Sequence, residues 1–132
     1  MTYLLDTNIV SALMKFPAGV VAQHLRKLDA EEVCTSIIAV AEIRYGIGKS
    51  GSQRLAVQFA RIEPVLRIEP FLQPAEAHYA RIRNETESIG LTVSQNDLLI
   101  AAHAEALEAV LVTDDRIFLH VPGLKVENWL QA

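Results

Sequence analysis

The sequence predicts an α/β fold of three layers, with helices on both faces of a short, mainly parallel central sheet. Two observations support this prediction. Short, nearly all-apolar segments alternate along the chain with longer segments of helical periodicity, which is typical of a parallel sheet covered on both faces. The 132 residues are 51% apolar and 21% charged, the size and composition of one globular domain. We therefore expect residues 1–132 to form a single domain.

The predicted strands are short and nearly all apolar, as expected of strands buried on both faces. In chain order they are Thr2–Leu5, Val33–Ser36, Val65–Ile68, Val110–Thr113 and one last strand in the tail Phe118–Trp129. Two of these strands are followed directly by acids, Asp6 after the first and the pair Asp114 and Asp115 after the fourth. Sites in such sheets form beyond the carboxyl ends of the strands, so these acids are candidate site residues.

The predicted helices carry apolar residues at intervals of three and four. In chain order they are Asn8–Lys15, Val20–Leu28, Ile37–Gly46, Leu55–Ile62, Pro74–Ile89 and Ser94–Ala109. Pro17 prevents the first helix from continuing, Pro74 opens the fifth and Gly90 ends it, and Ser94 opens the last.

Two further acids occupy apolar helix faces. Glu42 shares its face with Ile38 and Ala39, and Asp97 shares its face with Ile100. An isolated buried carboxylate costs several kcal/mol, whereas a shared divalent cation removes both that cost and the mutual repulsion. Four such acids converging from separate segments would present the hard oxygen ligands that suit Mg²⁺ or Mn²⁺.

Each acid also has an ordinary structural explanation, and these stay open beside metal binding. They are helix capping by Asp6, a capping-box-like start formed by Ser94 and Asp97, an ion pair of Glu42 with Arg44 or Arg81, and a turn at Asp114 and Asp115. His103 is interpreted as a helix-packing residue. A basic rim for phosphates is a further hypothesis, with these members: Arg44, Lys49, Arg81, Arg83 and Arg116.

Four segments follow one another in an order that matches a known family. They are Leu5–Ile9, Ser36–Gly46, Asn96–Ala104 and Leu111–Phe118, the last followed by Val121–Leu124 and Glu127–Trp129. No single motif is specific, but the ordered set covers nearly the whole chain. It resembles the PIN-domain ribonucleases, and in particular the VapC toxins of bacterial type II toxin–antitoxin pairs.

The resemblance implies a PIN-like fold and a site made of Asp6, Glu42, Asp97 and Asp115. We prefer Asp115 over Asp114 for the fourth position, because the family's acid usually lies two residues after a Ser or Thr. All four acids are expected to act in catalysis and in holding Mg²⁺, with Mn²⁺ as the alternative.

The resemblance also implies a metal-dependent endoribonuclease that cleaves a tRNA, forms a homodimer and is inhibited by a VapB-like antitoxin. Asn8 and Thr113 have side chains able to hold the carboxylates in place, although turn or cap chemistry would explain them equally well. Apolar faces on Val20–Leu28 and Leu55–Ile62 favour a partner independently.

Charge and composition exclude several classes of protein. Twelve basic and sixteen acidic residues give a net charge of −4, which counts against a simple DNA-binding module. The longest stretch without a charged residue, Phe16–Leu25, is far short of the ~20 apolar residues of a membrane span. A single cysteine, Cys34, excludes an intrachain disulfide, so we expect a cytoplasmic protein.

Three other functions stay open on the sequence alone. A haloacid-dehalogenase-like metal-dependent phosphohydrolase would use Asp6-Thr7-Asn8 as its nucleophile motif, although Asn8 replaces the second acid of that motif. A receiver-like acidic switch also has acids at strand ends, with Lys125 as the one candidate for its lysine. A non-catalytic PIN-like chain would only bind its antitoxin.

Overall fold

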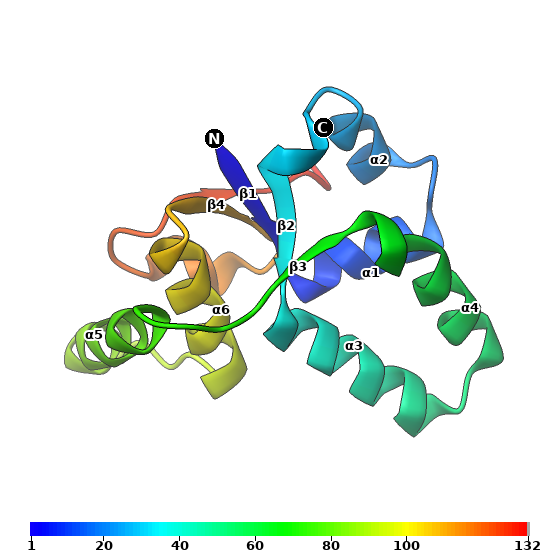
Figure 1. Cartoon of the computed structure of the whole chain (residues 1–132). Coiled ribbons are helices and arrows are strands. Elements are labelled where there is room, and N and C mark those ends of the chain that lie inside the picture. Colours follow the sequence, from blue (N-terminus) through cyan, green and yellow to red (C-terminus); the bar gives the residue numbers. More distant parts are fainter. Residues whose placement is uncertain (132) are drawn as a thin grey trace.

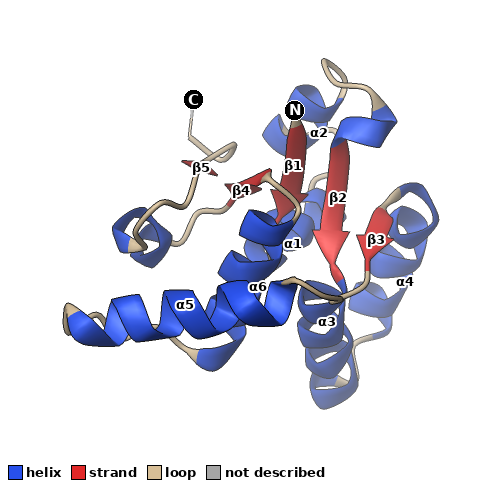
Figure 2. Ribbon diagram, turned by 60° about the vertical axis from the view of Figure 1, so that its left-hand side comes forward, coloured by secondary structure: helices blue, strands red, loops and turns tan. Residues whose placement is uncertain are grey.

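A five-stranded, wholly parallel sheet forms the centre of the computed structural model, which describes residues 1–131 (Figures 1 and 2). The strands lie in the order β3-β2-β1-β4-β5. Their bounds are Thr2–Leu5 (β1), Val33–Ser36 (β2), Arg67–Glu69 (β3), Ala109–Val112 (β4) and Val126–Glu127 (β5). This confirms the predicted α/β class with its parallel central sheet.

Helices cover both faces of this sheet. Their bounds are Thr7–Lys15 (α1), Val20–Leu25 (α2), Ile37–Ser50 (α3), Gln53–Ile62 (α4), Ala75–Ser88 (α5) and Gln95–Ala106 (α6). Short 3-10 turns span Ala30–Glu32, Glu63–Val65 and Arg116–His120. Figures 1 and 2 show α5 and α6 on one side of the sheet and α1 and α4 on the other.

Two apolar cores lie on the two faces because successive strand residues point in opposite directions. In β1, Leu4 packs into the core that includes α5 and α6, whereas Leu5 packs into the core formed by α1 to α4. In β4, Leu111 and Val112 divide between the two cores in the same way. The sheet is therefore buried on both faces, which explains its uniformly apolar strands.

The carboxyl ends of the three central strands meet at one edge of the sheet. Leu5 is in register with Thr35 of β2 on one side and with Val112 of β4 on the other. Ser36 and Thr113 therefore end up as neighbours of Asp6. The chain turns directly from β1 into α1 and from β2 into α3, so residues of both helices reach the same edge.

Several predicted boundaries were wrong. Helix α3 runs past Gly46 to Ser50, because Gly46 and Gly48 are tolerated on its exposed side, and Gly51 ends it with a φ of 64°. Helix α2 ends at Leu25, where a 3-10-like turn begins. The other shifts are modest: β3 is Arg67–Glu69 after a 3-10 turn, α6 ends at Ala106, and β4 begins at Ala109.

No helix within residues 1–131 combines the length and the hydropathy needed to cross a bilayer.

Candidate active site

A cavity of about 530 Å³ opens at the carboxyl edge of the sheet and contains all four predicted acids. Its lining residues come from four separate parts of the chain: Asp6, Thr7, Asn8, Ser11, Ala12, Lys15, Phe16, Glu42, Asp97 and Asp115. Asp114 is not among them. The structure therefore brings together residues that are up to 109 positions apart, as the topology at this edge requires.

Asp6 is the most buried of the four acids, with 4% of its surface exposed. Its Oδ1 accepts a hydrogen bond from the Thr7 backbone N–H at 2.8 Å, so the capping role is real. Its Oδ2 accepts from the Thr113 hydroxyl at 2.7 Å. Burial raises the pKa of Asp6 to about 6, although both hydrogen bonds lower it, and Asp97 and Glu42 raise it slightly further.

Thr113 connects the acids at the ends of β1 and β4. While its hydroxyl donates to Asp6, its oxygen accepts from the Asp115 backbone N–H at 3.0 Å. Asn8 supports this turn, because its Oδ1 accepts from the Asp114 backbone N–H at 3.3 Å. Its Nδ2 lies 3.5 Å from the Thr113 hydroxyl. Thr113 thus contacts a site carboxylate directly, whereas Asn8 acts on the turn that carries Asp115.

Glu42 is half-buried on α3, and its Oε1 accepts a hydrogen bond from the Thr7 hydroxyl at 3.0 Å. The alternative of an ion pair with Arg44 or Arg81 was wrong. Arg44 pairs instead with Glu63, and Arg81 pairs with two other glutamates. Sequence reasoning gave Thr7 no role, yet it contacts two of the four acids.

Asp97 lies in the first turn of α6. Its backbone N–H donates to the Ser94 hydroxyl at 3.2 Å, which is half of the capping box. Within residues 1–131 the reciprocal bond of a capping box, from the Ser94 backbone N–H to the Asp97 carboxylate, is not formed. Burial raises the pKa of Asp97, the Ser94 contact lowers it, and the nearby charges of Asp115 and Glu42 raise it further.

The two acids after β4 point to different places. Asp115 lines the carboxylate cavity, and its Oδ1 also accepts from the Ile117 backbone N–H at 3.1 Å, which caps the turn Arg116–His120. Asp114 accepts a hydrogen bond from Asn128 at 2.8 Å and lies on the wall of an adjoining cavity. Of the two, only Asp115 lies with the other three acids.

A buried hydrogen bond joins the helices that carry Glu42 and Asp97. His103 of α6 lies 2.7 Å from the Ser36 hydroxyl through its Nδ1, and Ser36 caps α3 by accepting from the Ile38 backbone N–H at 3.0 Å. Burial lowers the pKa of His103, so its ring is neutral at pH 7. This contact agrees with the helix-packing interpretation of His103.

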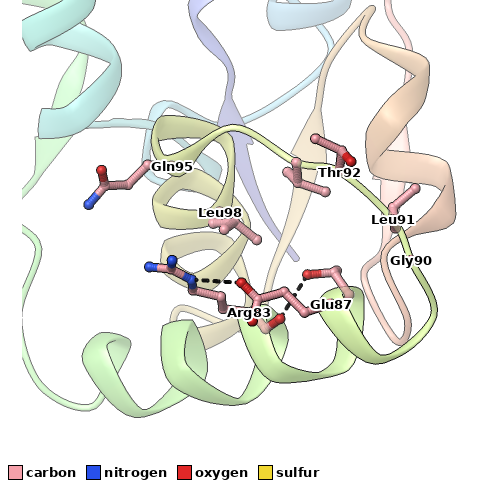
Figure 3. A pocket seen from close by; sticks show the side chains of 9 residues that line it. Arg83, Glu87, Gly90, Leu91, Thr92, Gln95 and Leu98 are labelled. Carbon is pink, nitrogen blue, oxygen red and sulfur yellow. Dashed lines mark hydrogen bonds and ion pairs between the residues drawn. The ribbon is translucent and has the colours of Figure 1, made fainter.

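None of the five cations of the hypothetical basic rim lines the carboxylate cavity. Arg83 pairs with Glu87 at 3.2 Å on the wall of a separate cavity of about 350 Å³ beside Gly90 and Leu91 (Figure 3). Arg44 and Arg81 are also ion-paired, and Lys49 lies over the Tyr45 ring. The cation that lines the carboxylate cavity is Lys15, which belongs to the polar face of α1 with Asn8 and Ser11 at spacings of three and four.

The donor set fits a hard divalent cation bound in an open site. Within residues 1–131, no three His, Cys, Asp or Glu side chains already stand close enough together to hold a metal. Mg²⁺ usually binds through one or two carboxylates, several waters and substrate phosphates, and it does not need a closed protein cage. Four carboxylates around one cavity, one of them almost wholly buried, supply such ligands.

The family model of the PIN domain matches residues 3–124 of this chain. Ribonuclease VapC2 of Rickettsia felis is 36% identical over 98% of both chains. This chain belongs to the VapC ribonucleases of the PIN-domain family. The tRNA(fMet)-specific endonuclease VapC of Salmonella typhimurium is 32% identical over 96% of this chain and 97% of its own.

Solved VapC-family structures share the fold. The Rickettsia felis VapBC2 complex, bound to a promoter DNA fragment, superposes with a TM-score of 0.88 at 33% identity, covering 98% of this chain and 99% of that one. DNA-bound VapBC from Salmonella typhimurium superposes with a TM-score of 0.86 at 28% identity, covering 98% of both chains. Family membership confirms the predicted resemblance, and nothing in these comparisons supports the phosphohydrolase or the non-catalytic alternative.

Proposed function

We propose that this VapC-family ribonuclease is the toxin of a type II toxin–antitoxin pair and that it cleaves a tRNA at the cavity of Asp6, Glu42, Asp97 and Asp115. The supporting observation is the convergence of these four acids in one cavity at the carboxyl edge of the sheet. The name of the Salmonella relative supports a tRNA as the substrate class.

Asp6 and Asp97 are the residues we propose as holders of Mg²⁺ or Mn²⁺, with Glu42 and Asp115 beside them. A divalent cation in such a site lowers the pKa of a bound water and neutralises charge on the scissile phosphate. The raised pKa values of Asp6 and Asp97 support this assignment, because a nearby cation would relieve the burial and repulsion that cause them.

The surrounding residues fix these carboxylates before RNA arrives. Thr113 and the Thr7 backbone N–H each hold one oxygen of Asp6, which sets the orientation of that carboxylate. The Thr7 hydroxyl holds one oxygen of Glu42 and leaves the other available to orient an attacking water or to accept its proton. Asn8 fixes the backbone of the turn that presents Asp115.

We expect a VapB-like antitoxin as the partner, because similar solved chains are found in VapBC complexes. We further propose a homodimer, in which apolar side chains exposed on the single chain are covered, and a cytoplasmic location for the single domain of residues 1–132.

The test is cleavage of total tRNA by the purified chain with Mg²⁺, with Mn²⁺ and with EDTA, followed by sequencing of the new RNA ends. We expect discrete cuts in a small number of tRNAs, and no cuts in EDTA. Asp115→Asn and Asp114→Asn form a matched pair, because Asp114 lies outside the carboxylate cavity. Loss of cutting in the first variant alone would support the site, whereas equal effects would argue against it.

A further inference from the structure

We propose that Lys15 and Phe16, at the carboxyl end of α1, dock one nucleotide of single-stranded RNA beside the carboxylate cavity. The Phe16 ring stacks on the base, and the Lys15 ammonium contacts an adjacent phosphate. This inference rests on the proposed function and adds to it a specific binding position for the RNA. Both residues line the same cavity as the four acids.

Lys15 supplies positive charge where a polyanion must approach four carboxylates. It is exposed, and it is the one cationic side chain among the described residues that line the cavity. Within residues 1–131 it forms no ion pair, unlike Arg44, Arg67, Arg81 and Arg83. A phosphate entering this cavity therefore meets an ammonium that has not already been neutralised.

Phe16 presents an aromatic ring to solvent beside this charge. It is 65% exposed, although a ring of this size is normally buried in a core. It also lines a second cavity of about 300 Å³, whose other lining residues are Ala12, Gly19, Val20, Val21 and Leu130. The ring therefore stands between an apolar hollow and the carboxylate cavity. Unstacked RNA bases bind aromatic faces of this kind largely regardless of sequence.

The backbone holds Phe16 firmly in place. Its N–H donates to the Ala12 carbonyl at 2.9 Å, and its carbonyl accepts from the Gly19 N–H at 2.8 Å. A Cβ atom added at Gly19 would lie only 2.9 Å from the Cβ of Phe16, so glycine permits this tight turn. Pro17 disfavours a helical conformation at Phe16, whose φ of −129° and ψ of 73° lie outside the helical region. An exposed ring on a fixed backbone loses little entropy when it binds a base.

An apolar side chain of a protein partner would also fit the hollow behind Phe16. Charge complementarity favours RNA, because the ring and the ammonium follow one another on the chain and both face the proposed cleavage site. A nucleotide offers both an aromatic face and an anion, whereas an apolar side chain has no charge to pair with Lys15.

The test uses a fluorescein-labelled, random-sequence RNA of about ten nucleotides, bound in EDTA and followed by anisotropy over a salt series. Phe16→Leu should weaken binding roughly 5- to 150-fold, since stacking is worth about 1–3 kcal/mol per base, and Phe16→Trp should restore it. Lys15→Gln should reduce the slope of log K against log salt by about 0.7. Ile89→Leu and Lys125→Gln are matched controls, because Ile89 is 61% exposed and neither residue lines the carboxylate cavity.

Cleavage of total tRNA by the same variants separates the inference from the function on which it rests. We expect Phe16→Leu to raise KM far more than it lowers kcat. If the native chain cleaves tRNA, and Phe16→Leu and Lys15→Gln both bind RNA as the native chain does with an unchanged KM, this inference alone would be overturned. A native chain that neither binds nor cleaves RNA would overturn both. Loss of a co-purifying antitoxin in Phe16→Leu with RNA binding intact would assign the ring to a protein partner instead.

Discussion

The Thr113 hydroxyl lies 2.7 Å from the Asp6 carboxylate and joins the ends of two neighbouring strands. The Asp115 backbone N–H donates to the hydroxyl oxygen and cannot accept a proton in return. The hydroxyl therefore donates its one proton to Asp6. A single hydroxyl therefore positions the most buried acid of the site and the turn that presents another.

Replacing this hydroxyl should slow RNA cleavage, although all four acids remain in place. Thr113→Val keeps the shape of the side chain but removes the donor to Asp6. We expect RNA cleavage to fall roughly 10- to 100-fold, as is usual when a group supporting a metal ligand is lost. Thr86→Val is the control, because Thr86 is equally buried but donates to the Arg83 carbonyl in α5. Equal cleavage rates in the two variants would contradict this role of Thr113.

The capping and site explanations of Asp97 predict different effects on stability. The Ser94 cap uses the Asp97 backbone N–H, so Asp97→Asn leaves the cap intact and removes a charge that faces Asp115 and Glu42. In EDTA its melting temperature should equal or exceed that of the native chain, while RNA cleavage is abolished. Ser94→Ala should instead cost about 0.5–2 kcal/mol and retain cleavage. Full activity in Asp97→Asn would count against the site.

Stability in EDTA should fall as the buried Asp6 ionises. Burial raises the pKa of Asp6 from 3.8 to about 6, so the folded chain holds this proton more tightly than the unfolded chain. The resulting stabilisation is complete below pH ~4 and is lost as the pH rises through about 6, a change of about 3 kcal/mol. Denaturant unfolding of the native chain and Asp6→Asn across this range measures it. If the difference in free energy of unfolding between the two chains did not change with pH, the pKa of Asp6 would be the same in the folded and unfolded chains.

Divalent cations should stabilise the folded chain, because the carboxylates converge only when it is folded. The free energy of unfolding increases by RT ln(1 + [L]/Kd), which is about 2.7 kcal/mol when the metal concentration is a hundred times its Kd. In thermal melts, the melting temperature of the native chain should rise with increasing Mn²⁺, and that of Asp97→Asn should rise much less. A melting temperature unaffected by metal, and by metal together with RNA, would exclude the proposed metal site.

The free chain should be a dimer and should bind its antitoxin. Light scattering on a sizing column measures the first property, and co-expression with a small neighbouring reading frame measures the second. We expect a complex without ribonuclease activity, because a basic antitoxin side chain that reaches the carboxylates would compete with the metal. A strictly monomeric chain that does not bind the protein encoded by the neighbouring reading frame would contradict both expectations.

The positions of the acids could be predicted from sequence because each follows a pattern that depends only on local chemistry. Asp6 and Asp115 follow apolar strand segments, and parallel strands place their carboxyl ends at one edge. Glu42 and Asp97 interrupt helix faces that are otherwise largely apolar. The sequence could not choose between a cap and a site for Asp6, and the structure shows that one carboxylate can do both, since each oxygen has its own donor.

The contacts among side chains could not be predicted, because they depend on how elements pack. Thr7 was not singled out, although a hydroxyl one residue after a strand-end acid was a usable signal for its contact with Glu42. Lys15 and Phe16 also went unnoticed, since they end a helix and their cavity exists only once α3 and α6 are in place. The partner of Arg44 is Glu63, on a later turn of the chain, so it could not be predicted, whereas the spacing of four between Arg81 and Glu85 on α5 was a usable signal.

The most direct test of the account is the initial rate of tRNA cleavage as a function of Mg²⁺ concentration, measured for the native chain, Asp6→Asn and Asp97→Asn. We expect saturable, Mg²⁺-dependent cleavage by the native chain and no cleavage by either folded variant at any Mg²⁺ concentration. Native-like rates in both variants, or cleavage by the native chain that persists unchanged in EDTA, would contradict it.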